Sequence, residues 1–487
     1  MKLKTLTLVL IILTVGVSAA AEKQDKEYFA VLINGEKAGH GTHSRVVEDV
    51  TMTIKRGGIA VTTHTIETSI ETTDGEPLGF EALQDMSMMK MRMEGTVSDG
   101  MVNVTVKSPT GSNRRSFQWP EGAVMAEGMR LLALEKGLKE GTEFTAKVFS
   151  LMLMDAVETE ISIGEVKEVE LINQTQRLRE MTTEMVMPGA GRLVTKGYVD
   201  DQAMARKQIV NMMGLSFEMV ACSKEIALSE NNPIEILTET MLKSPRPLDP
   251  ENAEAIRYRL SVNQGQEELG IPSDDNQTVR KLENGDVLIT IEPTEAPASV
   301  PYPYQGSDEQ VLEWLKSGNF VQSDDPRIKA LAEEAVGDAE DAAQAAKNIE
   351  AFVADYIDRK GLSVGYASAT EILENRSGDC SEFAVLTCSL LRAAGIPAQM
   401  VVGIAYVDEF AGLNQRFGGH AWCRAYIGGK WVGLDAAFTS AGLGGYGPGH
   451  IAQAYGGGEL ADFLGILNSL GRFEIAQAKV IEKGSAK

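Results

Sequence analysis

The sequence predicts a multidomain α+β protein, in which a mostly antiparallel β region precedes a region of mixed helices and strands. At 487 residues the chain exceeds the ~100–200 residues of an ordinary domain, so several domains are expected. Residues 27–230 contain short alternating apolar and polar runs, separated by hairpin signals such as Asn34-Gly35 and Asp74-Gly75. Such runs are typical of antiparallel strands. Helical periodicity becomes prominent only after about residue 306.

The first 21 residues have the pattern of a secretory signal peptide. Lys2 and Lys4 form a short basic start, an apolar run of about a dozen residues follows, and Ala19 and Ala21 supply small residues for cleavage. The alternative, an uncleaved membrane anchor, is less favoured because the run falls short of the ~20 residues that span a bilayer. We therefore expect a periplasmic or secreted protein.

Changes of pattern divide the rest of the chain into three segments. Residues 22–230 are predicted to form the β-rich domain, with one helix that ends at Gly137. Residues 231–305 contain two strand patterns and a proline-containing stretch, so they are predicted to form a small β subdomain and linker. Residues 306–487 are predicted to form the domain that carries the helices.

Composition and charge exclude some classes of partner. The chain is 43% hydrophobic and 24% charged, as expected of a folded globular protein. Its formal net charge of −23 repels nucleic acids and anionic membranes at long range. We therefore expect no nucleic-acid partner, and no membrane association beyond the signal peptide.

Methionine is concentrated in the β-rich region, where 17 of the 21 methionines lie between residues 86 and 219. The favoured interpretation is deformable core filling in a broad sheet. Two alternatives are an adaptable apolar groove for peptide or lipid and a soft-metal site for copper(I). The last would make the protein a copper carrier.

Four cysteines are too few for a disulfide scaffold in so long a chain. Cys380 and Cys388 cannot pair if both lie on one helix, because their separation along it would be about 12 Å. One disulfide bridge remains possible among the four, and Cys388 and Cys423, which fall within apolar elements, are expected in the core. The spacings include no C-x-x-C and the histidines are scattered, so we predict no metal site and no cofactor.

Cys380 lies in the first turn of a predicted helix. Asp379 is a favourable N-cap residue, and Glu382, three positions later, completes a capping-box pattern. The unpaired N–H groups and the dipole at a helix start stabilise an anion, and therefore a thiolate. This position suits a nucleophile better than a packing residue.

A base and an orienting acid for this thiol follow along the chain. Two strands are predicted to meet at the hairpin turn Gly428-Gly429. That turn places Trp422 opposite Asp435, and His420 diagonally from Asp435 on the same face, within reach of its side chain. A lone cysteine or histidine is more often structural, but a thiol, a base and an acid in this order are the parts of an acyl-transfer site.

Two blocks carry these residues: GDCSEFAVLTCSLLRAAGIPAQMVVGIAY and GGHAWCRAYIGGKWVGLDAAF. On them, residues 363–450 resemble the core of the transglutaminase-like superfamily, particularly its exported bacterial members. The resemblance implies a papain-like α+β core, with Cys380 as nucleophile, His420 as base and acid, and Asp435 as orienting carboxylate. One departure is that many relatives have Asp-Pro-Thr where this chain has Asp435-Ala436-Ala437. This changes the following loop and leaves the chemistry intact.

Three further residues are candidates for substrate binding. The backbone N–H of Cys380 is expected to be one oxyanion donor, and Tyr366 or Asn375 is placed to supply a second. Trp422 is expected to form a wall of the acyl pocket, to pack against the sheet, or to do both.

The sequence therefore predicts an exported thiol-dependent acyl-transfer enzyme that acts on amide bonds of a peptide or protein substrate. Hydrolysis, as by a cysteine peptidase or amidase, is favoured over amine transfer of the transglutaminase type, because a small pocket open to water hydrolyses by default. The alternative is a non-catalytic peptide- or envelope-binding scaffold built on a transglutaminase-like core.

Overall fold

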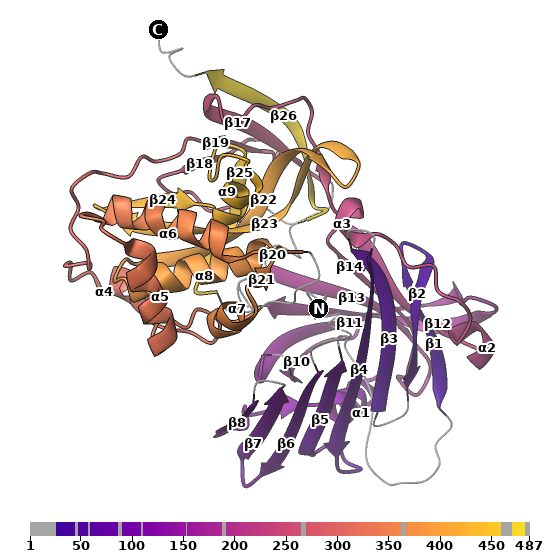
Figure 1. Cartoon of the computed structure of the whole chain (residues 1–487). Helices are drawn as coiled ribbons and strands as arrows, with labels where there is room; N and C mark the ends of the chain where they lie inside the picture. Colours follow the sequence, from indigo (N-terminus) through magenta and orange to yellow (C-terminus); the bar gives the residue numbers. More distant parts are fainter. Residues whose placement is uncertain are drawn as a thin grey trace. The chain divides into compact units, whose positions relative to one another are not determined.

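A computed structural model describes most of the chain, which forms two compact units (Figure 1). The units are Met1–Ile236 and Leu237–Lys487. The predicted signal peptide lies outside the described residues. None of the helices described has both the length and the apolar character needed to cross a bilayer. The described residues are 26–43, 47–56, 59–85, 90–108, 111–151, 153–187, 191–263, 269–361, 367–458 and 470–482.

The first unit is built on one long sheet of fifteen strands, in the order β8-β7-β6-β5-β4-β3-β2-β1-β15-β14-β13-β12-β11-β10-β9. Neighbours pair antiparallel except β9 and β10, which confirms the predicted β-rich region. Asn34 and Gly35 form the first hairpin turn and both have the positive φ that this turn needs. The strands are β1 (Glu27–Ile33), β2 (Glu36–His43), β3 (Val47–Arg56), β4 (Ile59–Glu71), β5 (Pro77–Asp85), β6 (Lys90–Ser98), β7 (Met101–Ser108), β8 (Gly111–Gln118), β9 (Ala123–Val124), β10 (Glu143–Ser150), β11 (Asp155–Glu170), β12 (Thr175–Met187), β13 (Gly191–Val199), β14 (Ala205–Met212) and β15 (Leu215–Cys222).

One full helix interrupts this sheet, as the sequence predicts. Helix α1 (Ala126–Lys136) ends at the C-cap residue Gly137. Its N-terminus is capped by a residue far away in the sequence. The carboxylate of Glu71 accepts the backbone N–H groups of Glu127 and Gly128 at 2.7 and 3.1 Å. Two short helices, α2 (Lys224–Ala227) and α3 (Ile236–Glu239), follow the last strand.

Several methionines of the first unit are core residues. Met129 and Met181 are 1% and 3% exposed and share one apolar cluster with Ile161. This packing agrees with the favoured interpretation of methionine as deformable core filling.

The second unit contains the helices, two further sheets and a two-stranded pair. The five-stranded sheet has the order β16-β23-β22-β25, with β24 beside β23, and the four-stranded sheet has the order β18-β19-β17-β26. The strands are β16 (Leu242–Lys243), β17 (Ala253–Val262), β18 (Gln277–Lys281), β19 (Val287–Ile291), β20 (Arg359–Lys360), β21 (Ser377–Gly378), β22 (Ala398–Phe410), β23 (Leu413–Ile427), β24 (Lys430–Leu434), β25 (His450–Gly456) and β26 (Phe473–Glu482).

Strands from the predicted 231–305 segment join the same sheet as the end of the chain, since β17 pairs with both β19 and β26. The division of this unit into 231–305 and 306–487 stays a prediction. Strands predominate over the whole described chain, so the protein is mostly β rather than evenly divided between α and β.

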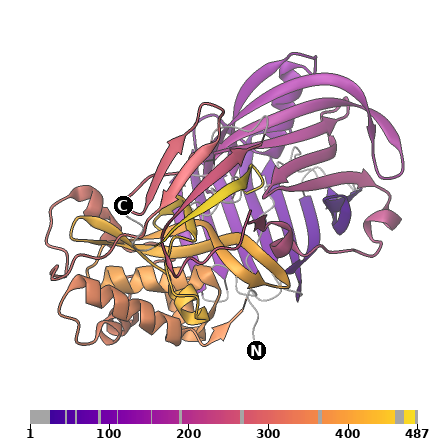
Figure 2. The ribbon, with the colours of Figure 1, turned by 90° about the horizontal axis from the view of Figure 1, so that it is seen from above.

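The helices of the second unit surround α8, whose residues are almost all buried. The core formed by α5, α6, α8 and the facing strands includes Ile349, Leu386, Leu390 and Val402, each no more than 2% exposed. Figure 2 shows these helices, in orange, gathered beside the golden strands of the same unit. The helices are α4 (Glu309–Leu312), η1 (Glu313–Leu315), α5 (Pro326–Val336), α6 (Ala342–Tyr356), α7 (Ala369–Asn375), α8 (Cys380–Ala393) and α9 (Ala436–Ala441).

Helix α8 begins at Cys380 because both halves of the predicted capping box form. The Asp379 side chain accepts the backbone N–H of Ser381 at 3.1 Å, and Glu382 accepts the backbone N–H of Asp379 at 2.9 Å. Glu382 is fully buried and also accepts the backbone N–H of Ala367 at 2.9 Å. The cap therefore fixes the start of the helix against the segment before it.

The hairpin of β23 and β24 confirms the predicted register. Tyr426 pairs with Trp431, and the pair farthest from the turn is Cys423 with Leu434. Gly428 and Gly429 occupy the turn with φ values of 58° and 87°. This register delivers Asp435 beside the strand that carries His420.

We expect Gly378→Ala to destabilise the second unit by roughly 1–3 kcal/mol, because the new methyl group would overlap the side chain of the buried Glu382. The measurement is urea unfolding. Gly270→Ala is the matched control, since Gly270 is exposed and its added methyl group meets no other atom within 4 Å. Equal stability of the two variants would contradict this account of the cap.

Candidate active site

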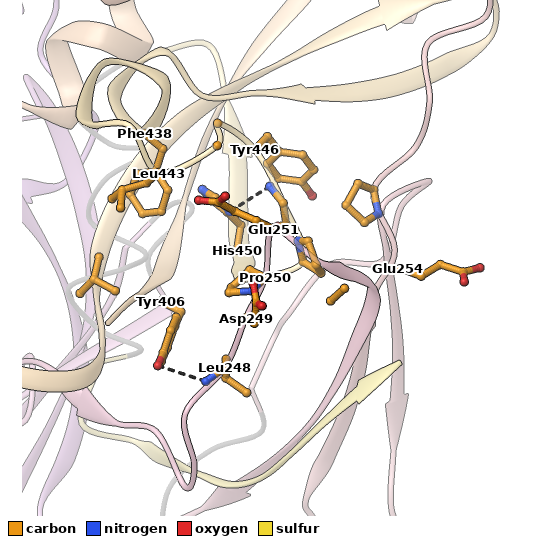
Figure 3. A pocket seen from close by; sticks show the side chains of 18 of the residues that line it. Leu248, Asp249, Pro250, Glu251, Glu254, Tyr406, Phe438, Leu443, Tyr446 and His450 are labelled. Carbon is orange, nitrogen blue, oxygen red and sulfur yellow. Dashed lines mark hydrogen bonds between the residues drawn. The ribbon is translucent and has the colours of Figure 1, made fainter. Parts of the chain in front are cut away.

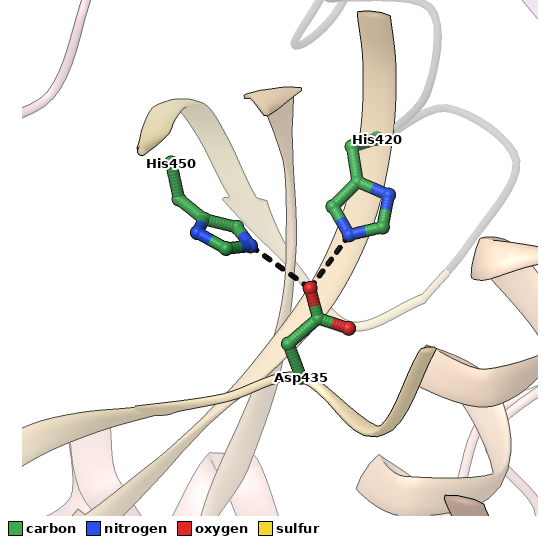
Figure 4. A group of neighbouring side chains, drawn as sticks. All are labelled: His420, Asp435 and His450. Atoms are coloured by element: carbon green, nitrogen blue, oxygen red, sulfur yellow. Dashed lines mark hydrogen bonds and ion pairs between the residues drawn. The ribbon is translucent and has the colours of Figure 1, made fainter. Parts of the chain in front are cut away.

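Three elements bring the predicted catalytic side chains together. Cys380 is the first residue of α8, His420 lies on β23, and Asp435 is the N-cap residue of α9. His420 Nε2 lies 2.7 Å from Asp435 Oδ2 (Figure 4). The sulfur of Cys380 is close enough to this imidazole to raise its pKa. Since Asp435 occupies Nε2, Nδ1 is the nitrogen left for the sulfur. The grouping agrees with the sequence analysis, and the three catalytic roles stay predictions.

The pair of His420 and Asp435 is buried and charged. Their side chains are only 8% and 1% exposed. Burial lowers the pKa of His420, but the Asp435 carboxylate and the Cys380 sulfur raise it to about 10. Burial raises the pKa of Asp435, but His420 and His450 outweigh burial and hold that pKa well below its usual range. An imidazolium and a carboxylate are therefore the stable forms at neutral pH.

A second histidine, which the sequence analysis missed, binds the same carboxylate oxygen. His450 Nε2 lies 2.9 Å from Asp435 Oδ2, and its side chain is 2% exposed. Figure 4 shows the two rings approaching one oxygen from different sides. His450 follows a glycine-rich stretch without strand periodicity, so no local pattern marked it. Its place depends on β22, which pairs with both β23 and β25 and so brings them to the same carboxylate.

Aromatic rings enclose the two histidines. Trp422 is 2% exposed, and its ring centroid lies 5.9 Å from that of His420 and 5.1 Å from that of His450. Phe438 and Tyr446 lie 4.8 and 5.0 Å from the His450 ring. Trp422 also belongs to an apolar cluster of the sheet, so it packs the core and shields the ion pair at once. A site closed to water strengthens the charged hydrogen bonds inside it.

The two other candidate residues are not joined to this group. Asn375 is the last residue of α7, and its side-chain nitrogen donates to the carbonyl of Glu371 at 2.9 Å. An oxyanion role would require that hydrogen bond to break. Tyr366 lies outside the described residues. The second oxyanion donor therefore stays a prediction.

A half-buried carboxyl group supports the backbone of Asp435. Glu350, on α6, accepts the backbone N–H of Asp435 at 2.5 Å. Burial, together with the nearby Asp435 carboxylate, raises the pKa of Glu350 to about 7. The positions of α6 and of the Asp435 carboxylate are therefore linked by a group that titrates near neutral pH.

His420, Asp435 and His450 are also a set of residue types that could bind a metal ion, since their nearest polar atoms lie within 4.8 Å of one another. Hydrogen bonding accounts for this grouping, because Oδ2 of Asp435 faces Nε2 of both rings at 2.7 and 2.9 Å. A metal ion would have to replace both hydrogen bonds.

A cavity of about 1090 Å³ adjoins the site. His450, Phe438 and Tyr446 form part of its wall, and Figure 3 shows their side chains together with those of the segment around Pro250. Among the described residues that line it, none is a lysine or an arginine. Its acidic residues are Asp249, Glu251, Glu254, Glu292, Glu295 and Asp408.

The second unit thus brings a thiol, an imidazole and a carboxylate into one group. Residues 329–436 match the model of the transglutaminase-like superfamily, so this part of the chain is a transglutaminase-like domain. An uncharacterized protein of Mycobacterium leprae (strain TN) is 32% identical over 99 residues, which cover 18% of this chain and 35% of that protein. The chain thus spans about a third of the length of this curated relative.

Two solved structures show remote similarity. One is the periplasmic domain of TgpA from Pseudomonas aeruginosa, with 16% identity and a TM-score of 0.27 over 42% of this chain and 88% of that chain. The other is a candidate cysteine protease from Cytophaga hutchinsonii, with 18% identity and a TM-score of 0.29 over 47% of this chain and 84% of that chain.

We expect Glu350→Gln to flatten the pH dependence of stability between about pH 4.5 and pH 7. The pKa of Glu350 in the folded protein lies above its ordinary value of 4.5. Its contribution to folding stability is therefore complete below pH 4.5 and is lost as the pH rises through about 7. The stability of the variant relative to wild type should rise by up to about 3 kcal/mol across this window.

Urea unfolding at pH 4.5 and pH 7.5 checks this expectation. Glu333→Gln, which removes an exposed carboxylate from α5, is the control. A stability difference between Glu350→Gln and wild type that is the same at both pH values would refute the link between Glu350 and the pH dependence.

Proposed function

We propose that this protein is an exported thiol-dependent enzyme that transfers acyl groups from amide bonds of peptides or protein side chains. Cys380, His420 and Asp435 would act as its catalytic triad in a papain-like α+β core. The observation that carries the proposal is one buried imidazole that binds Asp435 through Nε2 and interacts with Cys380. Export rests on the pattern of residues 1–21.

In the first half-reaction, the Cys380 sulfur attacks the carbonyl carbon of the amide and forms a carbon–sulfur bond. Negative charge moves to the carbonyl oxygen, where the backbone N–H of Cys380 at the start of α8 would stabilise it. The imidazolium of His420 gives its proton to the amide nitrogen, and the carbon–nitrogen bond breaks. An amine leaves and a thioester remains on Cys380.

In the second half-reaction, the neutral imidazole of His420 takes a proton from the incoming nucleophile. That nucleophile attacks the thioester carbon, and the carbon–sulfur bond breaks to restore the thiolate and the imidazolium. Water gives a carboxylic acid, whereas an amine gives a new amide. We favour hydrolysis, because the partly exposed thiol lies within reach of water.

Asp435 contributes by holding the ring and stabilising its positive charge. The carboxylate accepts from Nε2, so the protonated form of His420 persists, and Nδ1 is directed away from Asp435. A cost accompanies this arrangement, because an imidazolium with a raised pKa donates its proton to the leaving amine less readily.

The adjoining cavity is the candidate channel for the substrate. Its acidic lining disfavours an anionic peptide, and its aromatic side chains Phe438 and Tyr446 offer apolar contact. We therefore propose neutral or basic peptide segments as the acyl donors.

Incubation with a library of neutral and basic peptides should produce a thioester on Cys380, detected by mass spectrometry of the digested protein. Cys380→Ala should give no adduct, because it lacks the sulfur. An adduct on wild type at another residue, or none with any peptide, would count against the proposal and favour the binding scaffold.

Alkylation by iodoacetamide at pH 6 should be fast at Cys380, and His420→Ala should slow it by roughly 10–100-fold, because a free thiol is largely protonated there. Cys222 is the internal reference, since it is also partly exposed and burial raises its pKa. Labelled peptides are quantified by mass spectrometry. If Cys380 reacts no faster than Cys222 in the wild type, the thiol is not activated.

A further inference from the structure

We propose that His450 is a positioning residue of the site, which holds the Asp435 carboxylate in the orientation that His420 requires. The importance of this role for turnover rests on the proposed function. The contact of a second imidazole with the Asp435 carboxylate is independent of that function.

The carboxylate of Asp435 is fixed by three donors. Oδ1 accepts the backbone N–H of Phe438 at 3.0 Å, which caps α9. Oδ2 faces His420 Nε2 at 2.7 Å and His450 Nε2 at 2.9 Å. With His450 absent, Oδ2 would keep one partner, and the group could rotate about its side-chain bonds. A buried carboxylate that loses a donor is costly, because a lone pair of its oxygen is left without a partner.

The neutral ring of His450 can serve as this donor in only one tautomer. Burial lowers the pKa of His450, more than the Asp435 carboxylate raises it, so the ring is neutral at neutral pH. A carboxylate only accepts hydrogen bonds, so the single proton of the ring lies on Nε2. Nδ1 faces the backbone of Gly447, whose N–H lies at 3.3 Å and whose carbonyl oxygen lies at 3.0 Å. The loop before β25 therefore holds the far side of the ring, and the Asp435 carboxylate requires the proton on Nε2.

The surroundings of His450 hold its ring in place. The rings of Trp422, Phe438 and Tyr446 lie 4.8–5.1 Å from it. Among the described residues, its titratable neighbours include His420 and Asp435 as well as Tyr446. Glu350 affects this group indirectly, because it accepts the backbone N–H of Asp435. Packing of this kind is what a positioning group requires, since a loosely held donor would not restrain the carboxylate.

His450 also forms part of the cavity wall. His450 therefore lies between the candidate substrate channel and the Asp435 carboxylate. A group that only filled space at this point would need no nitrogen directed at Asp435.

The test compares His450→Gln, whose amide nitrogen reaches about as far as Nε2 and can donate, with His450→Leu, which fills space without a donor. We expect alkylation of Cys380 at pH 6 to fall roughly 10-fold in His450→Leu. His450→Gln should recover most of that loss. Thermal unfolding of both variants reports any general loss of structure.

A second readout is the far-downfield proton resonance of the His420–Asp435 hydrogen bond in the full-length protein. It should be present in wild type and His450→Gln, and broadened or lost in folded His450→Leu. Equal behaviour of the two variants in both measurements would overturn the positioning role.

The two proposals fail in different ways. A wild type that forms no acyl-enzyme, but whose downfield resonance still depends on His450, would overturn the enzymatic proposal and leave the positioning role intact. If instead His450→Leu forms the acyl-enzyme as fast as wild type, the positioning role is overturned and the enzymatic proposal stands.

Discussion

The second unit depends on a buried ion pair between an imidazolium and a carboxylate. Removing two charges from water is expensive, and their attraction compensates only when the remaining hydrogen-bonding positions are filled. Around Asp435 they are filled: a backbone N–H of α9 meets one oxygen, and two imidazoles meet the other. Each of these partners comes from a different strand or helix, so the pair forms only when the sheet and the helices have assembled.

The same constraint explains why the site is surrounded by large side chains. Trp422, Phe438 and Tyr446 keep water from the imidazoles, which strengthens the charged hydrogen bonds and raises the cost of any unpaired group. Close approach matters as well. Gly403 lies on β22 where an added Cβ would overlap the Trp422 ring and the carbonyl of Ile451, so only glycine lets β25 pack here. Small and large residues thus act together to bring the second histidine to the carboxylate.

The thiol is positioned separately, by the start of helix α8. Most of the hydrogen bonds that fix this helix start join residues close together in the sequence. Asp379 and Glu382 cap α8 through hydrogen bonds within four residues, so sequence spacing alone indicated where the helix begins. The tertiary structure adds that Glu382 is fully buried and also binds Ala367. A local cap and a long-range contact therefore share one side chain, which fixes Cys380 more firmly than a surface cap could.

The sequence by itself determined the β-rich character of the first unit, the first turn of α8, the register of the β23–β24 hairpin and, through that register, the approach of His420 to Asp435. These features depend on residues close together in the chain, so hydrophobic periodicity and turn-forming residues in the sequence are enough to predict them. Only the tertiary structure decided the role of His450, the support of Asp435 by Glu350, and the cavity beside them. Each of these depends on pairing or packing between distant segments, such as β22 with β25, and no local pattern encodes which distant segments will meet.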